Sequence, residues 1–418
     1  MIKPHSVIRA LDYERLAGSS GERKATDYLC GIIARLGFVP KVEEFPIVSF
    51  TTGTALLRIA DKEYVAHPFG INKSTTGEGE MVFVSNPSEL HSSYGRYAGK
   101  IVVMYGYDRS MYHVMRDNEI AGCITIGAPL RQSSSWSHRQ KAHTEGYIPS
   151  VSVDYSAGLS LSKLAGTNVT LTITQEVHET IARNVVVDVP GTGLDRAITY
   201  MTGHYDTVAR SHGATDNAGG VAVMLSVLEM LSKHRPARRL TAVFCSGEEL
   251  GLRGSLHYTE THKDEIMKYG ANVVNVDVAG DMLGTDCFIV TGTNQQLGYY
   301  DGITREEGMV FRTSLDIYSS DAMPFAVYEI PSVNIARFGG EATFFIHTPA
   351  DIAKRTNERG LTPTVKATKN LISRLLNAPV YPIMREIDSS LREKIEKYMW
   401  NCTFEEPKLL WKEKYKRI

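Results

Sequence analysis

The sequence predicts an α/β protein: a mixed, mainly parallel sheet sandwiched by helices, with a mostly β domain inserted into it. Three observations predict this class. Apolar, β-branched runs alternate with helical patterns from about residue 183. Residues 46–174 are instead rich in β-branched and aromatic residues, punctuated by Gly and Pro. At 418 residues the chain exceeds one ordinary core. We expect a main domain from residues 1–45 and 175–380, the insertion at 46–174, and a C-terminal helical extension at 381–418.

The first expected element is a short amphipathic helix over residues 22–36, which Gly37 ends. Its apolar residues recur at helical spacing: Ala25, Leu29, Ile32, Ile33 and Leu36. The segments VEEFPIVSF and TALLRIADKEYVAHPF follow, and their composition is typical of strands. The strand-like composition continues to about residue 175, which favours a mostly β insertion.

The main domain then continues with apolar runs that are typical of buried parallel strands. They are NVVVDVPG, AITYMTG, LTAVFCSG, NVVNVDVAG and SVNIARFGG. Between the second and third runs, GGVAVMLSVLEMLSKH places Val221, Met224, Leu225, Leu228 and Leu231 on one helical face. Strand, turn, helix and strand therefore recur, as in an α/β sandwich.

Bulk properties exclude some partners and favour one compartment. A formal net charge of −1 gives no overall field that would attract nucleic acid. No run approaches the roughly 18 apolar residues that a membrane span needs, so we expect no membrane partner. Five widely separated cysteines suit reduced thiols, and no apolar leader follows the first basic residues. A cytoplasmic location is the simplest interpretation.

Five possible metal ligands lie in short Gly-rich contexts, most of them at predicted strand ends. They are His204, Asp216, Glu249, Asp277 and His347. In an open parallel sheet, ligands bind beyond the carboxyl ends of the strands. Imidazole and carboxylate together suit a borderline cation such as zinc, and the absence of cysteine from these fragments argues against a structural zinc site. We therefore expect a catalytic metal at this edge of the sheet.

The fragments that hold these residues are TGHYDT, GATDNAGG, SGEELG, VNVDVAGD and IHTPAD. In this order they resemble the M28 family of zinc aminopeptidases, which implies a zinc-dependent exopeptidase fold and two divalent ions, with zinc as the expected metal. The resemblance implies that His204 and Asp277 hold one ion and that Glu249 and His347 hold the other. Asp216 would bridge them. Two such ions can polarise a carbonyl and acidify a water.

Two further acids take roles from the same resemblance. Glu248, the first Glu of GEELG, would be the general acid/base, and Asp206 would orient the imidazole of His204. The chain departs from the family at residues 344–346, where Phe, Phe and Ile precede the last His and many relatives place a tyrosine. Any help from a tyrosine must therefore come from elsewhere in the sequence.

The insertion resembles a protease-associated (PA) domain through GKIVVMYGYD, AGCITIGAP and GYIPSVSVDYSAGLSL. The alternative is a generic β appendage. At the C-terminus, REIDSSLREKIEKYMWNC predicts a docked helix with Ser390 and Glu393 as a capping box. The end KLLWKEKYKRI is basic and aromatic, which suits an RNA or membrane contact but is more typical of a solvated terminus or a subunit contact. Homo-oligomerisation therefore stays open.

The function predicted from these residues is an exopeptidase that removes N-terminal residues from peptides. Arg337 is a candidate for binding a substrate carboxylate, with a structural ion pair as its alternative. If Arg337 faces the pocket, a carboxypeptidase or dipeptidase competes with the aminopeptidase. A glutaminyl-cyclase-like acyltransferase, a non-catalytic binding protein on this scaffold and hydrolysis of a non-peptide amide stay as further alternatives. The sequence contains no GxxxxGK[ST], HExxH or GxSxG motif.

Overall fold

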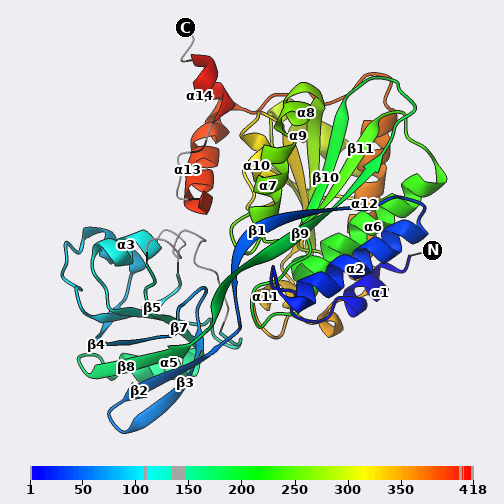
Figure 1. Ribbon diagram of the computed structural model, residues 1–418. Helices are drawn as coiled ribbons and strands as arrows, with labels where there is room; N and C mark the ends of the chain where they lie inside the picture. Colours follow the sequence, from blue (N-terminus) through cyan, green and yellow to red (C-terminus); the bar gives the residue numbers. More distant parts are fainter. Residues whose placement is uncertain (1, 108–110, 134–145, 404–406, 408, 416–418) are drawn as a thin grey trace.

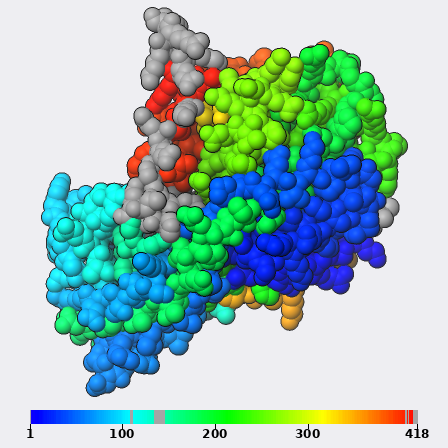
Figure 2. Space-filling view, in the orientation of Figure 1, coloured from blue at the N-terminus to red at the C-terminus, as the bar shows by residue number. Residues whose placement is uncertain are grey.

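The computed structural model describes residues 2–107, 111–133, 146–403, 407 and 409–415. It has a large α/β domain, and a smaller β-barrel projects from one end of it (Figures 1 and 2). The predicted fold class is confirmed. Among the described residues, no helix is long and apolar enough to cross a membrane.

An eight-stranded sheet forms the centre of the large domain. In spatial order its strands are β1 (Lys41–Phe50), β9 (Val177–Val189), β11 (Arg239–Cys245), β10 (Ile198–His204), β12 (Gly270–Val276), β15 (Ser332–Phe338), β13 (Thr285–Thr291) and β14 (Arg312–Leu315). The four central strands β11, β10, β12 and β15 are parallel, and β9 and β13 flank them in antiparallel pairings. The sheet is therefore mixed, with a parallel centre whose carboxyl ends share one edge.

Helices cover both faces of this sheet, as the apolar runs predict. One face packs against α1 (Pro4–Ala10), α2 (Ser20–Arg35), α6 (Gly219–Lys233), α9 (Asn294–Glu306) and α12 (Glu358–Asn377). The other packs against α7 (Arg253–Thr261), α8 (Lys263–Tyr269) and α10 (Met323–Ala326). The central strands are buried on both sides because apolar side chains of both faces meet a helix layer (Figure 1).

The smaller domain is a closed barrel of seven strands. Around the barrel they are β2 (Thr54–Ile59), β3 (Lys62–Pro68), β7 (Ser150–Val153), β6 (Gly122–Ile126), β5 (Ile101–Tyr105), β4 (Thr75–Val84) and β8 (Asn168–Thr174). Two short helices, α3 (Met111–Asp117) and α5 (Tyr155–Ser162), pack beside it. Strands β1 and β9 pair along Lys41–Phe50 and connect the barrel to the large sheet (Figure 1). The likeness of this barrel to a PA domain stays a prediction.

The C-terminal segment contains α13 (Arg392–Thr403) and α14 (Leu410–Tyr415). Ile395 and Met399 of α13 pack with Met323 and Ala326 of α10 in one apolar cluster. The turn before α13 is capped by Asp388, whose carboxylate accepts from the backbone amide of Ser390 at 2.9 Å. Ser390 itself donates its hydroxyl to Asp388 at 2.7 Å. Residues 404–406, 408 and 416–418 of the predicted extension lie outside the described residues.

Candidate metal centre

The four central strands deliver most of the candidate ligands to one edge of the sheet. His204 is the last residue of β10, and Asp277 directly follows β12. Glu249 follows β11 after a short turn, and His347 follows β15 after the short helix α11 (Glu341–Phe344). Because these strands are parallel, their carboxyl ends meet, and the four side chains converge.

Asp216 reaches the same edge from the turn that precedes α6, within Ala214–Ala218. Asp351 holds this turn, because its carboxylate accepts from the amides of Thr215 at 2.8 Å and Asp216 at 3.2 Å. Asn217 ties it to the end of β12 by donating to the carbonyl of Val276 at 2.9 Å. The position of Asp216 therefore depends on contacts from distant parts of the chain.

Asp216 lies between the two imidazoles. Its Oδ1 is 3.0 Å from Nε2 of His204, and its Oδ2 is 3.0 Å from Nε2 of His347. The Oδ1 atom of Asp277 is 3.4 Å from His204, and Oε1 of Glu249 is 3.3 Å from His347. Two groups of three donors, His204–Asp216–Asp277 and Asp216–Glu249–His347, thus share one carboxylate, and the candidate ligand atoms within each group lie within 4.8 Å of one another.

Two buried oxygens test whether this cluster fits metal ions. Oδ1 of Asp277 and Oε1 of Glu249 are buried and have no hydrogen-bond partner among the described residues. Buried polar atoms without partners are rare and costly, whereas a cation would satisfy both. One such oxygen belongs to each donor group, and the donors are nitrogen and oxygen atoms that suit zinc. The residues therefore fit a pair of divalent ions.

The charges of the cluster polarise its ionisable groups. Burial opposes the charge of Asp216, but His204 and His347 hold its pKa far below the usual range. Burial likewise opposes the charge of His347, yet Glu249 and Asp216 raise its pKa to about 10. Asp206, Asp216 and Asp277 raise the pKa of His204 well above its ordinary value against the same effect of burial. Without metal, the imidazoles are the cations that balance these acids.

Comparison with known proteins identifies the large domain. Residues 184–372 match the profile of Peptidase family M28, and this range contains all five candidate ligands. The large domain of this chain belongs to peptidase family M28. The protein is accordingly a metallopeptidase.

Individual relatives resemble the chain over different lengths. Aminopeptidase YwaD of Bacillus subtilis is 24% identical over 360 residues, which cover 83% of this chain and 78% of YwaD. Carboxypeptidase Q of Mus musculus is 25% identical over 209 residues, 46% of this chain and 44% of that protein. The structure of BSAP, a zinc aminopeptidase from Bacillus subtilis, has a TM-score of 0.73 and 19% identity, and covers 92% of this chain and 98% of its own. The similarity to BSAP shows that this chain has the same fold as that structure.

Asp206 lies behind the ligands of the M28 domain and contacts three parts of the centre. Its carboxylate accepts from the backbone amides of Glu248 at 3.2 Å and Glu249 at 3.3 Å. Its Oδ1 is also 3.5 Å from Nδ1 of His204. Asp206 therefore contacts the imidazole, as predicted, and also fixes the GEELG turn through its backbone amides. Asp206 is fully buried, so no solvent competes for these contacts.

Glu248 is buried beside the ligands. It forms a third group of neighbouring donors with His204 and Glu249. Burial raises the pKa of Glu248 well above its ordinary value, and the nearby acids Glu249 and Asp321 add to this while His204 opposes it. A carboxyl group with a raised pKa can both accept and return a proton near neutral pH.

Arg337 is occupied by structural contacts in the M28 domain. Its Nη1 forms an ion pair with Asp286, and its Nε donates to the carbonyl of Asp281 at 2.8 Å. Asp286 also accepts from the hydroxyl of Thr364 in α12 at 2.9 Å. These contacts correspond to the structural alternative that the sequence left open, so Arg337 has no place in the proposed site.

Three residues of the M28 domain that the sequence did not single out lie at the centre. Asp351 and Asn217 fix the Asp216 turn, and both stand inside the quoted fragments, so their proximity to ligands was a usable signal. Tyr318 also lies near the cluster: burial raises its pKa, and Asp277, Asp216 and Glu248 raise it further. Among 21 tyrosines, no sequence pattern distinguished it.

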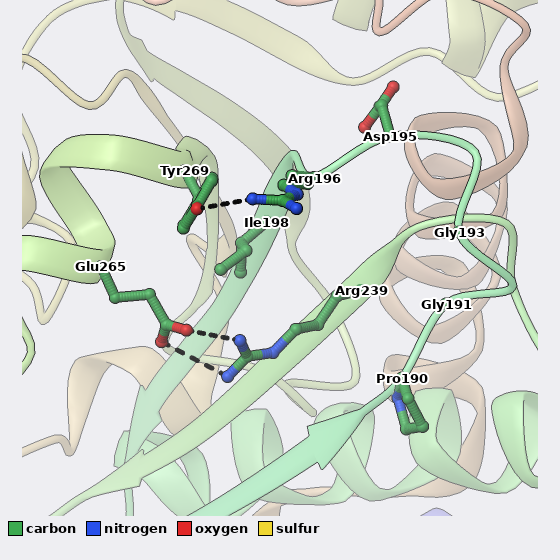
Figure 3. A pocket seen from close by; sticks show the side chains of 9 residues that line it. All are labelled: Pro190, Gly191, Gly193, Asp195, Arg196, Ile198, Arg239, Glu265 and Tyr269. Carbon is green, nitrogen blue, oxygen red and sulfur yellow. Dashed lines mark hydrogen bonds and ion pairs between the residues drawn. The ribbon is translucent and has the colours of Figure 1, made fainter.

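A separate cavity of about 360 Å³ lies at the other edge of the sheet (Figure 3). Ile198 and Arg239, the first residues of β10 and β11, line it, so it lies away from the ligands. Arg239 is paired there with Glu265 at 2.6 Å and with Asp188 at 2.7 Å. Two acids therefore neutralise Arg239, and Arg196, which also lines this cavity, donates to the hydroxyl of Tyr269 at 3.1 Å.

Proposed function

We propose that this protein is an exopeptidase with two zinc ions that releases N-terminal residues from peptides. The observation that carries the proposal is the paired donor set, in which one carboxylate, Asp216, lies 3.0 Å from each of two imidazoles. Each side also has a buried carboxylate oxygen that has no hydrogen-bond partner in the described part of the chain. A site for one ion would not need this duplication.

In this proposal His204 and Asp277 would hold one ion, Glu249 and His347 the other, and Asp216 both. Bound zinc ions supply polarisation of the scissile carbonyl and acidity to the attacking water. Glu248 takes the proton from that water and delivers it to the leaving amine. Its burial and acidic neighbours support this role, because they raise the pKa of its carboxyl group.

Relatives support the zinc ion and the direction of cleavage. YwaD is an aminopeptidase by name, and BSAP is a zinc aminopeptidase. The similarity to carboxypeptidase Q favours a second candidate, release of C-terminal residues by the same centre. Both candidate functions use the same ligands and the same proton transfer by Glu248. Only the end of the peptide from which residues are released distinguishes the two functions.

A peptide mixture read by mass spectrometry tests the proposal. Zinc-loaded protein is incubated with peptides of different lengths, including some with acetylated N-termini and some with amidated C-termini. We expect stepwise loss of N-terminal residues, blocked by acetylation and abolished by a chelator. Loss from the C-terminus would favour the second candidate. Internal cuts alone would contradict both, and cyclisation of N-terminal Gln peptides would favour an acyltransferase.

A further inference from the structure

A cavity of about 440 Å³ lies where the barrel meets the metal centre. Its barrel side comes from Phe69, residues 105–107, residues 125–128 and Arg131, and its other side from Ile346 and the proposed metal ligand His347. The volume is within the range of ordinary ligand pockets, roughly 300 to 1,000 Å³. A molecule in this cavity would therefore touch the barrel and lie beside His347 at the same time.

Arg131 is the charged side chain that the barrel contributes to this cavity. Its Nη2 donates to the carbonyl of Ile346 at 2.8 Å, and its guanidinium lies 5.6 Å from the ring centre of Phe344. The chain therefore holds the guanidinium next to the residue that precedes a metal ligand. Nε and Nη1 have no partner among the described residues, so two donors stay available for a ligand.

The charge of Arg131 has no counterion among the described residues. No carboxylate there forms an ion pair with it, whereas Arg355, the other arginine near this loop, is paired with Glu341. Arg131 is half-buried, and burial lowers its pKa, which Tyr105 offsets only in part. A half-buried guanidinium has lost part of its hydration, and without a counterion it favours binding of an anion from outside.

We propose that Arg131 determines specificity by binding a carboxylate of the peptide substrate, namely the terminal carboxylate of a short peptide. This inference rests on the proposed exopeptidase function. A guanidinium binds a carboxylate through two parallel hydrogen bonds. The Nη2 hydrogen that does not face Ile346 can provide one, and the adjacent Nε or Nη1 the other. Arg131 then fixes the far end of the peptide while the scissile bond lies at the metal centre.

The position of Arg131 limits the length of such a substrate. Its guanidinium is bonded to Ile346, so it lies on the order of 10 Å from the ions that His347 would help to hold, given backbone and side-chain dimensions. That span accommodates one or two residues beyond the scissile bond, at about 3.5 Å each, plus the ion pair. Dipeptides and tripeptides therefore fit better than longer chains. An acidic side chain on the N-terminal residue is the other source of a carboxylate.

Kinetics of Arg131 variants test the proposal. Wild type, Arg131→Gln and Arg131→Lys are compared on Leu-Gly and Leu-Gly-Gly, each as free acid and as amide, and on the p-nitroanilides of leucine and glutamate. We expect Arg131→Gln to raise KM for the free acids about 10- to 100-fold, because charge-assisted hydrogen bonds to the carboxylate are lost. The kcat for the free acids should stay nearly unchanged. Both KM and kcat should also stay nearly unchanged for the amides and for leucine p-nitroanilide. The KM of Arg131→Lys for the free acids should lie between those of wild type and Arg131→Gln. An effect confined to glutamate p-nitroanilide would assign the acidic side chain as the source.

Binding without turnover gives an independent readout. Dissociation constants of Leu-Gly-Gly and its amide are measured by calorimetry on zinc-loaded Glu248→Gln protein, with and without Arg131→Gln. Arg58→Gln, at an exposed arginine of β2 in the same barrel, is the matched control and should change nothing. Equal losses for acid and amide would show that Arg131 only tethers the barrel to Ile346 and would overturn the proposal. Failure of wild type to cleave leucine p-nitroanilide would instead contradict the proposed function, and the binding comparison would still decide the role of Arg131.

Discussion

At the scale of single residues, two buried carboxylates fix the backbone at two of the proposed acidic ligands, Asp216 and Glu249. Asp206 accepts from the amides of Glu248 and Glu249, and Asp351 accepts from those of Thr215 and Asp216. Each thus fixes a turn without contributing to the donor groups. Such supporting hydrogen bonds orient ligands before a metal binds.

Glu248→Gln should separate metal binding from catalysis. The amide cannot take a proton, so we expect kcat to fall by about 10²- to 10⁴-fold, the usual contribution of a general base. Zinc content by mass spectrometry should stay at the wild-type level because Glu248 is outside the proposed ligand set. Glu260→Gln on α7, at an exposed glutamate, is the matched control. Near-normal turnover by Glu248→Gln would contradict its assigned role.

Zinc binding should become tighter as pH rises. The acids around His347 raise its pKa to about 10 in the metal-free protein despite burial, so the imidazole is protonated at neutral pH. A metal binds only neutral imidazole and must displace this proton. Titration calorimetry in buffers of different ionisation enthalpy should show proton release, with affinity increasing from pH 6 to 8. Affinity that stays constant over this range, without proton release, would contradict the charge distribution described here.

At the scale of elements, α6 approaches the end of β12 closely enough to require glycine. A Cβ atom on Gly219 would lie 2.0 Å from the carbonyl oxygen of Ala279, two residues after the proposed ligand Asp277. The helix and the loop after β12 therefore support each other's position. Asp216 precedes this helix, so the same contact sets the distance between two proposed ligands.

Gly219→Ala should disturb both stability and the metal centre. The added methyl forces a backbone shift, which we expect to cost about 1–3 kcal/mol in unfolding free energy and to weaken zinc binding. Gly298→Ala on α9 is the matched control: its Cβ meets nothing within 4 Å, so stability should hold or rise slightly. Thermal unfolding and zinc titration of both variants measure the difference. Equal behaviour of the two variants would show that this contact is unimportant.

Sequence patterns predict helices and strands well where those elements are fully buried. They predict poorly where contacts between residues far apart in the chain determine the position of a side chain. Strands such as β10 and β12 are buried on both faces and rich in β-branched or apolar residues, and the apolar residues of α6 recur at helical spacing, so each leaves a local signal. The pairing of Arg337 with Asp286 has no local signal, because it joins residues 51 positions apart. The sequence could only leave both interpretations of Arg337 open. The hydrogen bond between Asp351 and the Asp216 turn also joins residues 135 positions apart, so the place of Asp351 in IHTPAD marked it as near a candidate ligand but not as the partner of Asp216.

At the scale of the whole molecule, the barrel is joined to the large sheet through β1 and β9 and contacts the loop that bears His347. The sequence predicts an insertion at this place, since composition changes at its borders. It does not predict the closed strand order of the barrel, because pairings such as β2 with β8 join segments more than a hundred residues apart. The hydrogen bond from Arg131 to Ile346 depends on that strand order, because the barrel positions the loop that carries Arg131.

The C-terminal helix α13 should stabilise the large domain. Ile395 is fully buried against α10 in a shared apolar cluster. Ile395→Ala removes this packing and leaves a cavity, so we expect a loss of about 2–5 kcal/mol in unfolding free energy. Chemical denaturation measures this loss, with Lys397→Ala, at an exposed lysine of the same helix, as the comparison. An unchanged midpoint for Ile395→Ala would show that α13 is not docked as described.

The central claim is that Asp216 joins two metal sites in one centre. Its most direct test is the zinc content of the protein, measured by mass spectrometry after metal-free protein is saturated with zinc and passed through a desalting column. We predict two zinc ions per chain, because beside each imidazole lies a buried carboxylate oxygen that has no hydrogen-bond partner among the described residues. A content of one ion per chain would contradict the claim.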